Sequence, residues 1–448
     1  MPAAKRDLVP FREAVRTWGA ISLQTFGGPA GQIAVMQRIL VDEKRWIGQR
    51  RFLHALNFCM LLPGPEAQQL AIYTGWLLNG TRGGLVAGTL FVLPGVVALL
   101  ALAAIYVAFG DAPLVAAVFA GLAPAVVAIV AQAVVRIGRR VVSHPALLGI
   151  AVAAFLAIAV FAVPFPAVVA VAAVAGWVLG RSVPNAIVSA VHAPADAEAP
   201  VLRDDALPDE GSSGGRGVRI LVLSMALWCA PLVLAAAMLG SDSTIARQGL
   251  FFSGTALISF GGAYAVLTFV AQRAVEVYGW VTPAEMVRGL ALAETTPGPL
   301  IMVVQFVAFL GAFRAPGGLD PWLAAVLGAL LTTWVTFVPC FALIFLGAPY
   351  VERLRGNRSL TAALTGVTAA IVGVIANLAF FFALHTLFAR VETRGVLQLD
   401  LPVWSSIRPT ELAISAAAFA MIFLARWSVL RTLGACALLG LLAGLILR

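Results

Sequence analysis

Long apolar stretches constrain this chain more than any other feature of its sequence. About 20 consecutive apolar residues cross the roughly 30 Å hydrocarbon core of a bilayer as a helix. Stretches of about that length lie near residues 85–109, 113–135, 219–240, 322–348, 361–389, 410–425 and 429–447. Region 146–180 adds two shorter spans that meet at Pro164-Phe165-Pro166. The sequence therefore predicts an all-α integral membrane protein.

The composition supports this class and excludes others. Charged residues make up 11% of the chain, against about 25% in ordinary globular proteins, too few to cover a water-soluble surface. Soluble enzymes are therefore excluded, and no basic stripe interleaved with aromatic residues points to nucleic acid. The four cysteines and four histidines are dispersed singly, without the spacing of a metal site or a disulfide framework. We expect no metal and no cofactor.

A polar segment divides the chain. Residues 182–217 are dominated by Ala, Pro, Asp, Glu, Gly and Ser, a composition typical of a flexible linker that cannot bury a core. We expect a first half at 1–181, this linker on the cytoplasmic side, a single extra transmembrane helix at 218–241 and a second half at 242–448. The first apolar run is interrupted by Arg16 and Gln24, so we expect no removable signal peptide.

The two halves are copies of each other. Phe26-Gly27-Gly28 recurs 234 residues later as Phe260-Gly261-Gly262, and Pro63-Gly64-Pro65 recurs at the same shift as Pro297-Gly298-Pro299. Further along, a shift of 245 pairs Pro94 with Pro339. The matched residues are not merely apolar, so the sequence predicts a duplication.

The orientation of the copies follows from counting spans. Each half contains two segments broken in the middle, with arms of only some 11–14 residues, too short to cross alone at 1.5 Å per residue. Whether both broken segments cross or both turn back as re-entrant hairpins, each half makes an even number of crossings. The single extra helix then inverts the second half, as in many secondary transporters. Positive charge favours hairpins and a cytoplasmic N-terminus. The alternative is that only the Pro-Gly-Pro segment of each half turns back, which would make the repeats parallel.

The glycine pairs are the first candidates for chemistry. Gly27-Gly28 and Gly261-Gly262 let a helix unwind within the membrane, so that a half-helix begins there with free N–H groups and the positive end of its dipole, a suitable place for an anion. Gln32 would add a neutral donor. The alternative is that these glycines only allow close packing of helices.

The Pro-Gly-Pro breaks are the stronger signal. Two prolines forbid a continuous helix, so the chain must break around Gly64 and Gly298. The four prolines, which we expect to act structurally, are Pro63, Pro65, Pro297 and Pro299.

Polar residues crowd both breaks. Gln68, Thr295 and Thr296 are candidate donors to a substrate, and the alternative is ordinary capping of the helix ends. Glu66 and Glu294 are candidates for proton coupling, because an ionisable residue within a membrane is costly and is by default a functional candidate. The alternative is a helix cap or a hydrated hairpin tip.

Basic residues stand at one equivalent position of the two copies. His54 and Arg288 lie on the arm that leads into each Pro-Gly-Pro break. They suit an anion pathway, since arginine forks onto a tetrahedral oxyanion. The alternative is that they extend toward lipid headgroups.

The repeated motifs resemble those of the bacterial chromate ion transporter family in its long two-domain form. The strings that carry the resemblance are Phe26 to Gln32, Leu62 to Gln69, Ser259 to Tyr264 and Glu294 to Pro299. The resemblance implies a multi-pass inner-membrane transporter that exports chromate, with sulfate as an analogue, by alternating access, and so confers chromate resistance. Rocking of one half against the other would alternate access. The second half lacks the proline after Gly262, so we expect the halves to do unequal jobs.

Other functions stay open at this point. A proton- or sodium-coupled carrier of another anion or of a small neutral solute would use the same breaks. A membrane-embedded enzyme lacks any cofactor fingerprint or nucleophile–histidine pair in its favour, so we expect no enzyme. A channel, and a homodimer rather than a monomer, are not distinguished by the sequence.

Overall fold

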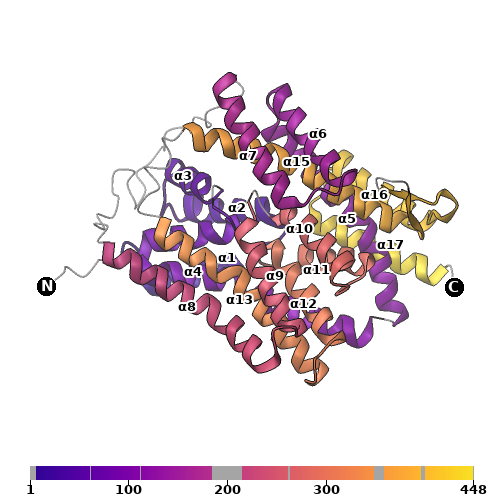
Figure 1. The fold of residues 1–448 in the computed structure, drawn as a ribbon, viewed down its shortest axis with the longest axis horizontal. Helices are drawn as coiled ribbons and strands as arrows, with labels where there is room; N and C mark the ends of the chain where they lie inside the picture. Colours follow the sequence, from indigo (N-terminus) through magenta and orange to yellow (C-terminus); the bar gives the residue numbers. More distant parts are fainter. Residues whose placement is uncertain are drawn as a thin grey trace. The chain divides into compact units, whose positions relative to one another are not determined.

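The structure, a computed structural model, describes residues 7–60, 62–110, 112–183, 214–260, 263–347, 358–394 and 399–446. Their backbone is almost entirely helical (Figure 1). Seven of the described helices are long and apolar enough to cross a membrane, and three shorter apolar helices accompany them. They cover the apolar stretches expected from the sequence, including the pair that meets near Pro164. The protein is an all-α, multi-pass membrane protein.

The first half consists of short helices followed by long ones. Its helical elements are α1 (Phe11–Ser22), α2 (Gly28–Gln37), the π-helical turn η1 (Arg38–Glu43), α3 (Gln49–Cys59), α4 (Glu66–Phe109), α5 (Pro113–Val141), α6 (Pro145–Ala159) and α7 (Phe165–Ser182). The extra helix α8 (Gly214–Leu239) follows.

The second half repeats this order with one addition. Its elements are α9 (Thr244–Ile258), α10 (Ala263–Gln272), η3 (Arg273–Val277), α11 (Pro283–Thr295), η4 (Leu300–Met302), α12 (Val303–Arg314), α13 (Pro321–Gly347), α15 (Arg358–Leu387), β1 (Val391–Arg394), β2 (Leu399–Pro402), η6 (Trp404–Ser406), α16 (Pro409–Phe419), η7 (Ala420–Leu424) and α17 (Val429–Ile446). The antiparallel β1–β2 hairpin occupies the α15–α16 connection, where the first half has only residues 142–144.

Helix α4 is two helices joined by a bend. Asn79 (φ −136°) and Gly80 (φ +61°) leave the helical conformation, and the buried Asn79 amide donates a 2.7 Å hydrogen bond to the Val9 carbonyl. Glycine tolerates this left-handed φ without steric cost. The part after the bend corresponds to the apolar stretch expected from residue 85 onward.

Local backbone details recur in the two halves. The N–H groups of Trp46 and Trp280 each donate a 2.9 Å bond, to the carbonyls of Leu40 and Ala274. Both bonds close a π-helical turn at the end of a short helix. Because the acceptors, like the donors, lie 234 residues apart, the copies share backbone geometry as well as sequence. Their opposite orientation in the membrane stays a prediction.

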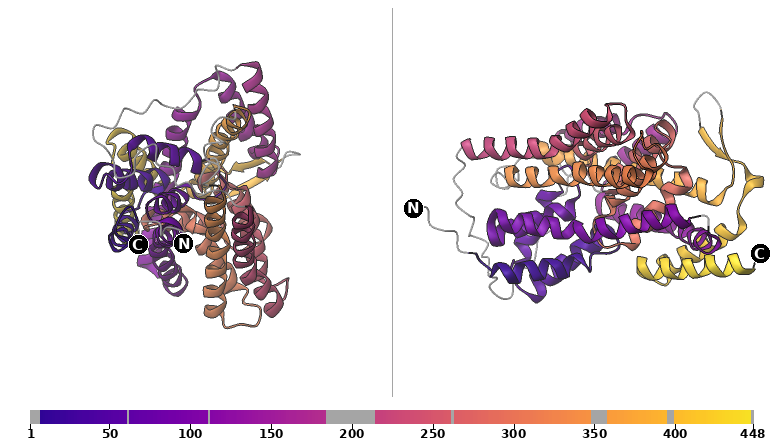
Figure 2. Two further views of the ribbon diagram at one scale, coloured as in Figure 1. Left: turned by 90° about the vertical axis from the view of Figure 1, so that its left-hand side faces the viewer. Right: turned by 90° about the horizontal axis from the view of Figure 1, so that it is seen from below.

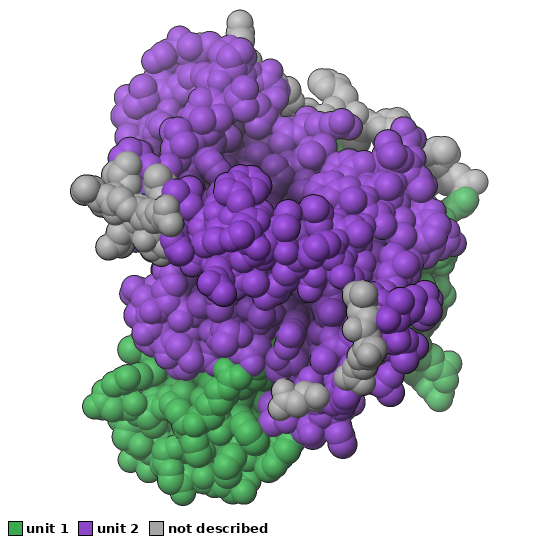
Figure 3. Space-filling view, turned by 90° about the vertical axis from the view of Figure 1, so that its right-hand side faces the viewer, with its two compact units in different colours: residues 1–100, 189–263, 296–356 green, residues 101–188, 264–295, 357–448 purple. Residues whose placement is uncertain are grey.

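The chain forms two compact units, and neither coincides with a half of the sequence. Unit 1 draws on residues 1–100, 189–263 and 296–356, and unit 2 on residues 101–188, 264–295 and 357–448 (Figure 3). Each unit therefore contains segments from both copies.

In unit 2, the last helix of each half packs on a long helix of the other half. A Cβ built on Gly176 of α7 would lie 2.6 Å from the Cα of Gly366 in α15. A Cβ on Gly440 of α17 would lie 2.7 Å from the Cα of Gly121 in α5. Small residues let helix backbones approach closely in membranes. Helix α7 of the first half thus packs on α15 of the second half, and α17 of the second half packs on α5 of the first half.

In unit 1, the extra helix α8 lies alongside α13 (Figure 2). The indole of Trp228 donates to the Val335 carbonyl at 3.0 Å, and the indole of Trp334 donates to the Leu227 carbonyl at 2.8 Å. Two indoles that donate in opposite directions fix the rotation of α8 against α13.

Candidate functional site

Each Pro-Gly-Pro break is held by the Phe-Gly-Gly break of the other half. The N–H of Gly64 donates to the Ser259 carbonyl at 2.9 Å, and the N–H of Gly298 donates to the Thr25 carbonyl at 3.0 Å. Both donors and both acceptors are separated by the repeat shift of 234 residues, so the two bonds are equivalent. All four residues belong to unit 1. The structure therefore pairs the Pro-Gly-Pro break of each half with the segment that leads into the Phe-Gly-Gly motif of the other half.

The local sequence explains why the chain can adopt this geometry. Gly64 and Gly298 have φ of +119° and +107°, in the region that favours glycine. Their flanking prolines have no N–H groups to leave unsatisfied. The hydroxyls of Thr25 and Ser259 donate to the carbonyls three residues earlier, at 2.8 and 2.9 Å. These side chains thereby satisfy carbonyls at the ends of α1 and α9.

The breaks also pack against the prolines within the long helices. Gly95, directly after Pro94 of α4, would place a Cβ 2.6 Å from the Pro297 carbonyl oxygen. At the equivalent place in the other copy, a Cβ on Gly64 would lie 2.9 Å from the sulfur of Cys340, directly after Pro339. Little room is left beside either break, since α4 packs against the second break and α13 against the first.

The first glycine pair adopts the expected unwound backbone. Gly27 and Gly28 have φ of +76° and +73°, and α2 begins at Gly28 with Pro29 in its first turn. No side chain caps the helix start, so its first N–H groups are free of intrahelical partners. The second pair, Gly261 and Gly262, lies outside the described residues.

Gln32 is committed to the Gly298 break. Its side chain is 1% exposed, and its amide donates a 2.6 Å hydrogen bond to the Gly298 carbonyl. Gly298 is thus bound on both sides by the first half, through its N–H and its carbonyl. The equivalent residue in the second half is Val266, which has no polar group, so the two breaks are not held equally.

Gln68, one of the predicted donors, has a side-chain amide without hydrogen-bond partners among the described residues. Its side chain is completely buried in the first turn of α4, and neither its nitrogen nor its oxygen has a hydrogen-bond partner among the described residues. A buried amide without partners costs about 1–3 kcal/mol and calls for an explanation. Glu66, two residues earlier, begins α4 and is partly buried, at a position where the helix dipole favours a carboxylate.

The Gly64 and Gly298 N–H groups are occupied in this conformation. An anion at the first break would instead meet the free N–H groups of the first turn of α4 and the amide of Gln68. At the second break, Thr296 is buried, while the Thr295 hydroxyl donates to the Leu292 carbonyl at 2.8 Å as a helix cap.

Glu294 forms a buried pair in unit 2. Its side chain is 1% exposed, its Oε1 accepts a hydrogen bond from the Tyr264 hydroxyl, and its Oε2 has no partner in the described part of the chain. Tyr264 was not singled out from the sequence. The signal that could have found it is its position, two residues after the second glycine pair and between apolar neighbours.

Arg288 also lies in unit 2, within an aromatic cluster. Its guanidinium donates a 3.0 Å bond to the Tyr106 hydroxyl and lies 5.8 Å from the centre of the Phe119 ring. Tyr106 in turn approaches Glu285 at 3.5 Å. His54 is half-buried on α3 in unit 1. The two equivalent basic residues therefore belong to different units.

No group of three or more His, Cys, Asp or Glu side chains that could hold a metal occurs within the described ranges. The described breaks instead gather N–H groups and neutral amides, a donor set suited to an anion.

A family model described as Chromate transporter matches residues 12–177 and 247–441. The chain belongs to the chromate transporter family. The matched segments contain both breaks of each half and omit the linker and all of α8. Proteins of this family are transporters, not enzymes.

Three curated relatives cover similar lengths. A chromate transport protein of Pseudomonas aeruginosa is 33% identical over 79% of this chain and 76% of its own length. A chromate transport protein of Cupriavidus metallidurans is 28% identical over 78% of this chain and 77% of its own. A probable chromate transport protein of Synechococcus elongatus is 28% identical, over 79% of each chain. No solved structure matches.

Proposed function

We propose that this protein exports chromate, a tetrahedral oxyanion resembling sulfate, from the bacterial cytoplasm across the inner membrane by alternating access. A cell that carries it would thereby tolerate chromate. Membership of the chromate transporter family and the names of its relatives support the substrate. The local chemistry of unit 1 supports an anion.

The observation that carries the proposal is the unsatisfied amide of Gln68. A fully buried side chain with both polar atoms unpartnered is expected where a ligand or water completes the hydrogen bonds. Its NH₂ group lies in the first turn of α4, where free N–H groups and the positive end of the helix dipole also favour an anion. We propose that Gln68 donates to an oxygen of the bound oxyanion.

Outward movement of a dianion requires no coupled ion. An inside-negative potential contributes about 2.3 kcal/mol per charge per 100 mV, so two negative charges are driven out. A coupled proton would add its own gradient to this driving force without being required for export. We assign that role to Glu294, because its buried carboxyl has one oxygen without a partner among the described residues, rather than to Glu66, which lies at the start of α4, where the helix dipole stabilises a carboxylate.

The moving bodies would be the compact units rather than the sequence halves. Each unit contains segments of both halves, and the reciprocal bonds of Gly64 and Gly298 tie the two halves together within unit 1. Rigid rocking of one half against the other would break these bonds, whereas movement of whole units preserves them.

The test is uptake of radiolabelled chromate into proteoliposomes under an imposed potential of either sign, with sulfate as competitor. We expect saturable, sulfate-inhibited flux that follows the potential as a net negative charge. Gln68→Met removes the amide at similar volume, and we expect it to raise the KM for chromate about tenfold or more, since a hydrogen bond to a charged group contributes about 1.5–3 kcal/mol.

Gln248→Met is the matched control. Gln248 is equally buried in unit 1, but its amide donates to the Ala308 carbonyl at 3.1 Å. We expect this substitution to lower thermal stability and to leave the KM unchanged. Flux that is absent in folded wild-type protein would exclude chromate as substrate. Equal effects of the two substitutions on KM would remove Gln68 from the binding site.

A further inference from the structure

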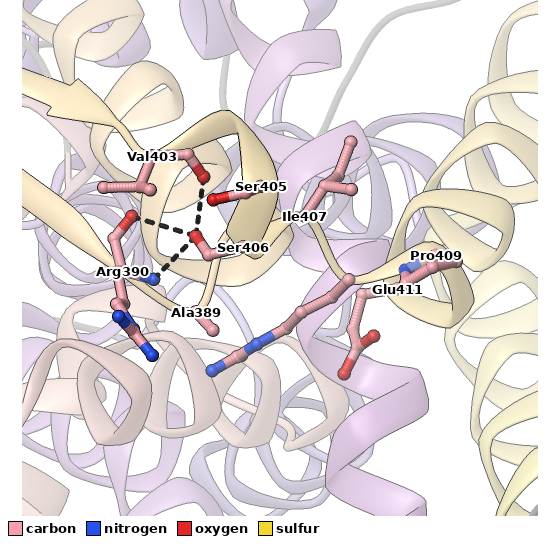
Figure 4. Close-up of a pocket in the computed structure, with 9 residues that line it drawn as sticks. Ala389, Arg390, Val403, Ser405, Ser406, Ile407, Pro409 and Glu411 are labelled. Atoms are coloured by element: carbon pink, nitrogen blue, oxygen red, sulfur yellow. Dashed lines mark hydrogen bonds between the residues drawn. The ribbon is translucent and has the colours of Figure 1, made fainter.

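The connection between α15 and α16 in unit 2 lines an open cavity that transport at the breaks does not use. It has a volume of about 460 Å³, and its lining includes Arg390, Ser405, Arg408 and Glu411 (Figure 4). The first half has no counterpart, because only three residues join α5 to α6. The cavity is therefore a feature of the 21-residue connection that the second half alone possesses.

Backbone bonds hold the walls of this cavity in place. The Ala389 N–H donates to the Ser406 carbonyl and the Arg408 N–H to the Leu387 carbonyl, both at 2.8 Å. The Ser406 hydroxyl accepts from the Arg390 N–H at 3.0 Å and lies 2.7 Å from the Val403 carbonyl oxygen (Figure 4). Backbone hydrogen bonds thus hold Arg390 and Arg408 in place near the two ends of the connection between α15 and α16.

The side chains that line the cavity carry a net charge of +1. Arg390 and Arg408 form no ion pair with any described residue, and Glu411 is the one acidic residue of the lining. Figure 4 shows the side chains of Arg390 and Glu411 extending to the same side of the loop. A single negative charge, such as that of a phosphodiester, would neutralise this set, whereas a dianion would overcompensate it.

The start of α16 strengthens the preference for an anion. This 11-residue helix begins at Pro409, and no side chain caps it. Its first N–H groups therefore lack intrahelical partners beside two guanidinium groups, which fork onto phosphate oxygens.

A second open cavity, about 610 Å³ and almost wholly apolar, lies further along the same helix. Its lining begins at Leu387 and Leu412, next to residues of the charged cavity, and continues along α16 and η7 through Ala416 and Phe419 to Leu424. The distance from Leu412 to Leu424 is about 18 Å at 1.5 Å per residue, close to the length of an acyl chain.

Aromatic residues indicate the depth of the charged cavity in the membrane. Trp404, adjacent to Ser405 of the lining, is 75% exposed. Its ring packs edge-on against Phe388 with centroids 5.6 Å apart. Exposed tryptophans concentrate at the level of the lipid headgroups. The charged cavity would then lie among the headgroups and the apolar cavity among the acyl chains.

We propose that unit 2 binds an anionic phospholipid, with its phosphate at Arg390 and Arg408 and an acyl chain along α16 and η7. The positive charge, the apolar cavity further along the helix and the exposed tryptophan are separate observations that agree on this occupant. The site is distinct from the breaks in unit 1.

The experiment is mass spectrometry of the intact, purified full chain in micelles that contain equal amounts of phosphatidylglycerol and phosphatidylcholine. We expect the wild type to retain phosphatidylglycerol preferentially. Arg390→Ala with Arg408→Ala should reduce that preference about tenfold, since each basic residue near an anionic surface contributes to attraction. Ala416→Phe should fill the apolar cavity and reduce retention of the lipid.

Matched variants separate specific from general effects. Arg139→Ala with Arg140→Ala removes the same charge from the exposed end of α5, and Ala413→Phe adds the same ring at an exposed position of α16 outside the cavity lining. Both should retain phosphatidylglycerol as the wild type does. If the double arginine variant fails to fold, Arg390→Gln alone, at an exposed position, should still lower the preference.

Three outcomes would overturn the proposal. Equal retention of the two lipids by the wild type would show that no anionic headgroup is selected. A preference that survives in the folded double arginine variant would place the selection elsewhere. Displacement of the lipid by sulfate, but not by chloride at equal ionic strength, would assign the cavity to free oxyanions.

Discussion

Gly95 and Gly298 lie in direct contact within unit 1: a Cβ built on Gly298 would be 3.3 Å from the Gly95 Cα, and one on Gly95 would be 2.6 Å from the Pro297 carbonyl oxygen. The contact joins the long helix of the first half to the Pro-Gly-Pro break of the second. Neither backbone can withdraw easily, because Gly298 is also bound by Thr25 and Gln32.

Gly95→Ala should therefore displace the second break. We expect a loss of about 1–3 kcal/mol of stability, typical of overpacking, together with reduced chromate flux. The measurement is thermal unfolding of the purified protein beside proteoliposome flux. Gly254→Ala, at an exposed helical glycine with nothing within 4 Å of a built Cβ, should be neutral or slightly stabilising. If Gly95→Ala and Gly254→Ala have the same stability and flux, the close contact at Gly95 contributes to neither.

Gln32→Val makes the first copy resemble the second, which has Val266. The substitution leaves the buried Gly298 carbonyl without its side-chain donor, and we expect a cost of about 1–3 kcal/mol. Thermal unfolding would measure it. Gln24→Val, at an exposed position, should change stability by no more than about 0.5 kcal/mol. An unchanged unfolding temperature for Gln32→Val would mean that its hydrogen bond contributes nothing net.

The two helix crossings of unit 2 should respond equally to substitution. A Cβ on Gly121 would lie 2.0 Å from the Cys436 carbonyl oxygen, and one on Gly366 would lie 2.3 Å from that of Ala172. We expect Gly121→Ala and Gly366→Ala each to lower the unfolding temperature. Gly434→Ala, where nothing lies within 4 Å, is the control. If only one of the two variants lowers the unfolding temperature, only that pair of crossing helices contributes to stability.

Glu294→Gln tests the proposed proton coupling. Glutamine keeps a hydrogen-bonding oxygen for Tyr264 but carries no titratable proton. We expect flux that still responds to membrane potential and no longer to an imposed pH gradient. Glu66→Gln should retain the pH response, because Glu66 lies at the start of α4, where the helix dipole stabilises its carboxylate. A normal pH response in Glu294→Gln would assign coupling to another group or to none.

Tyr264→Phe separates the roles within the buried pair. The carboxyl of Glu294 loses its one described partner but can still titrate. We therefore expect the pH dependence of flux to persist and its midpoint to shift, whereas in Glu294→Gln it disappears. The measurement is initial flux over a range of internal pH. Identical profiles for the wild type and Tyr264→Phe would show that the hydroxyl does not influence the carboxyl.

The sequence by itself determined the membrane class, the duplication and the positions of the breaks. These properties are local: an apolar run long enough to span lipid is helical because its backbone must bond to itself, and Pro63 and Pro65 interrupt a helix wherever they occur. Gln68 and Glu294 are predicted as candidates for the same reason, since a polar residue beside such a break is visible without knowledge of its surroundings.

Only the tertiary structure decided which segments meet. That Gly64 bonds to Ser259 and Gly298 to Thr25, and that α7 and α17 each pack on a helix of the other half, depends on contacts between residues in different halves. Repeated motifs are equally compatible with each half folding on itself. For the same reason the sequence did not indicate the role of Tyr264, and it did not show that His54 and Arg288 belong to different units. Burial and hydrogen-bond partners are set by packing between distant segments, whereas spacing along the chain fixes only where helices begin and end.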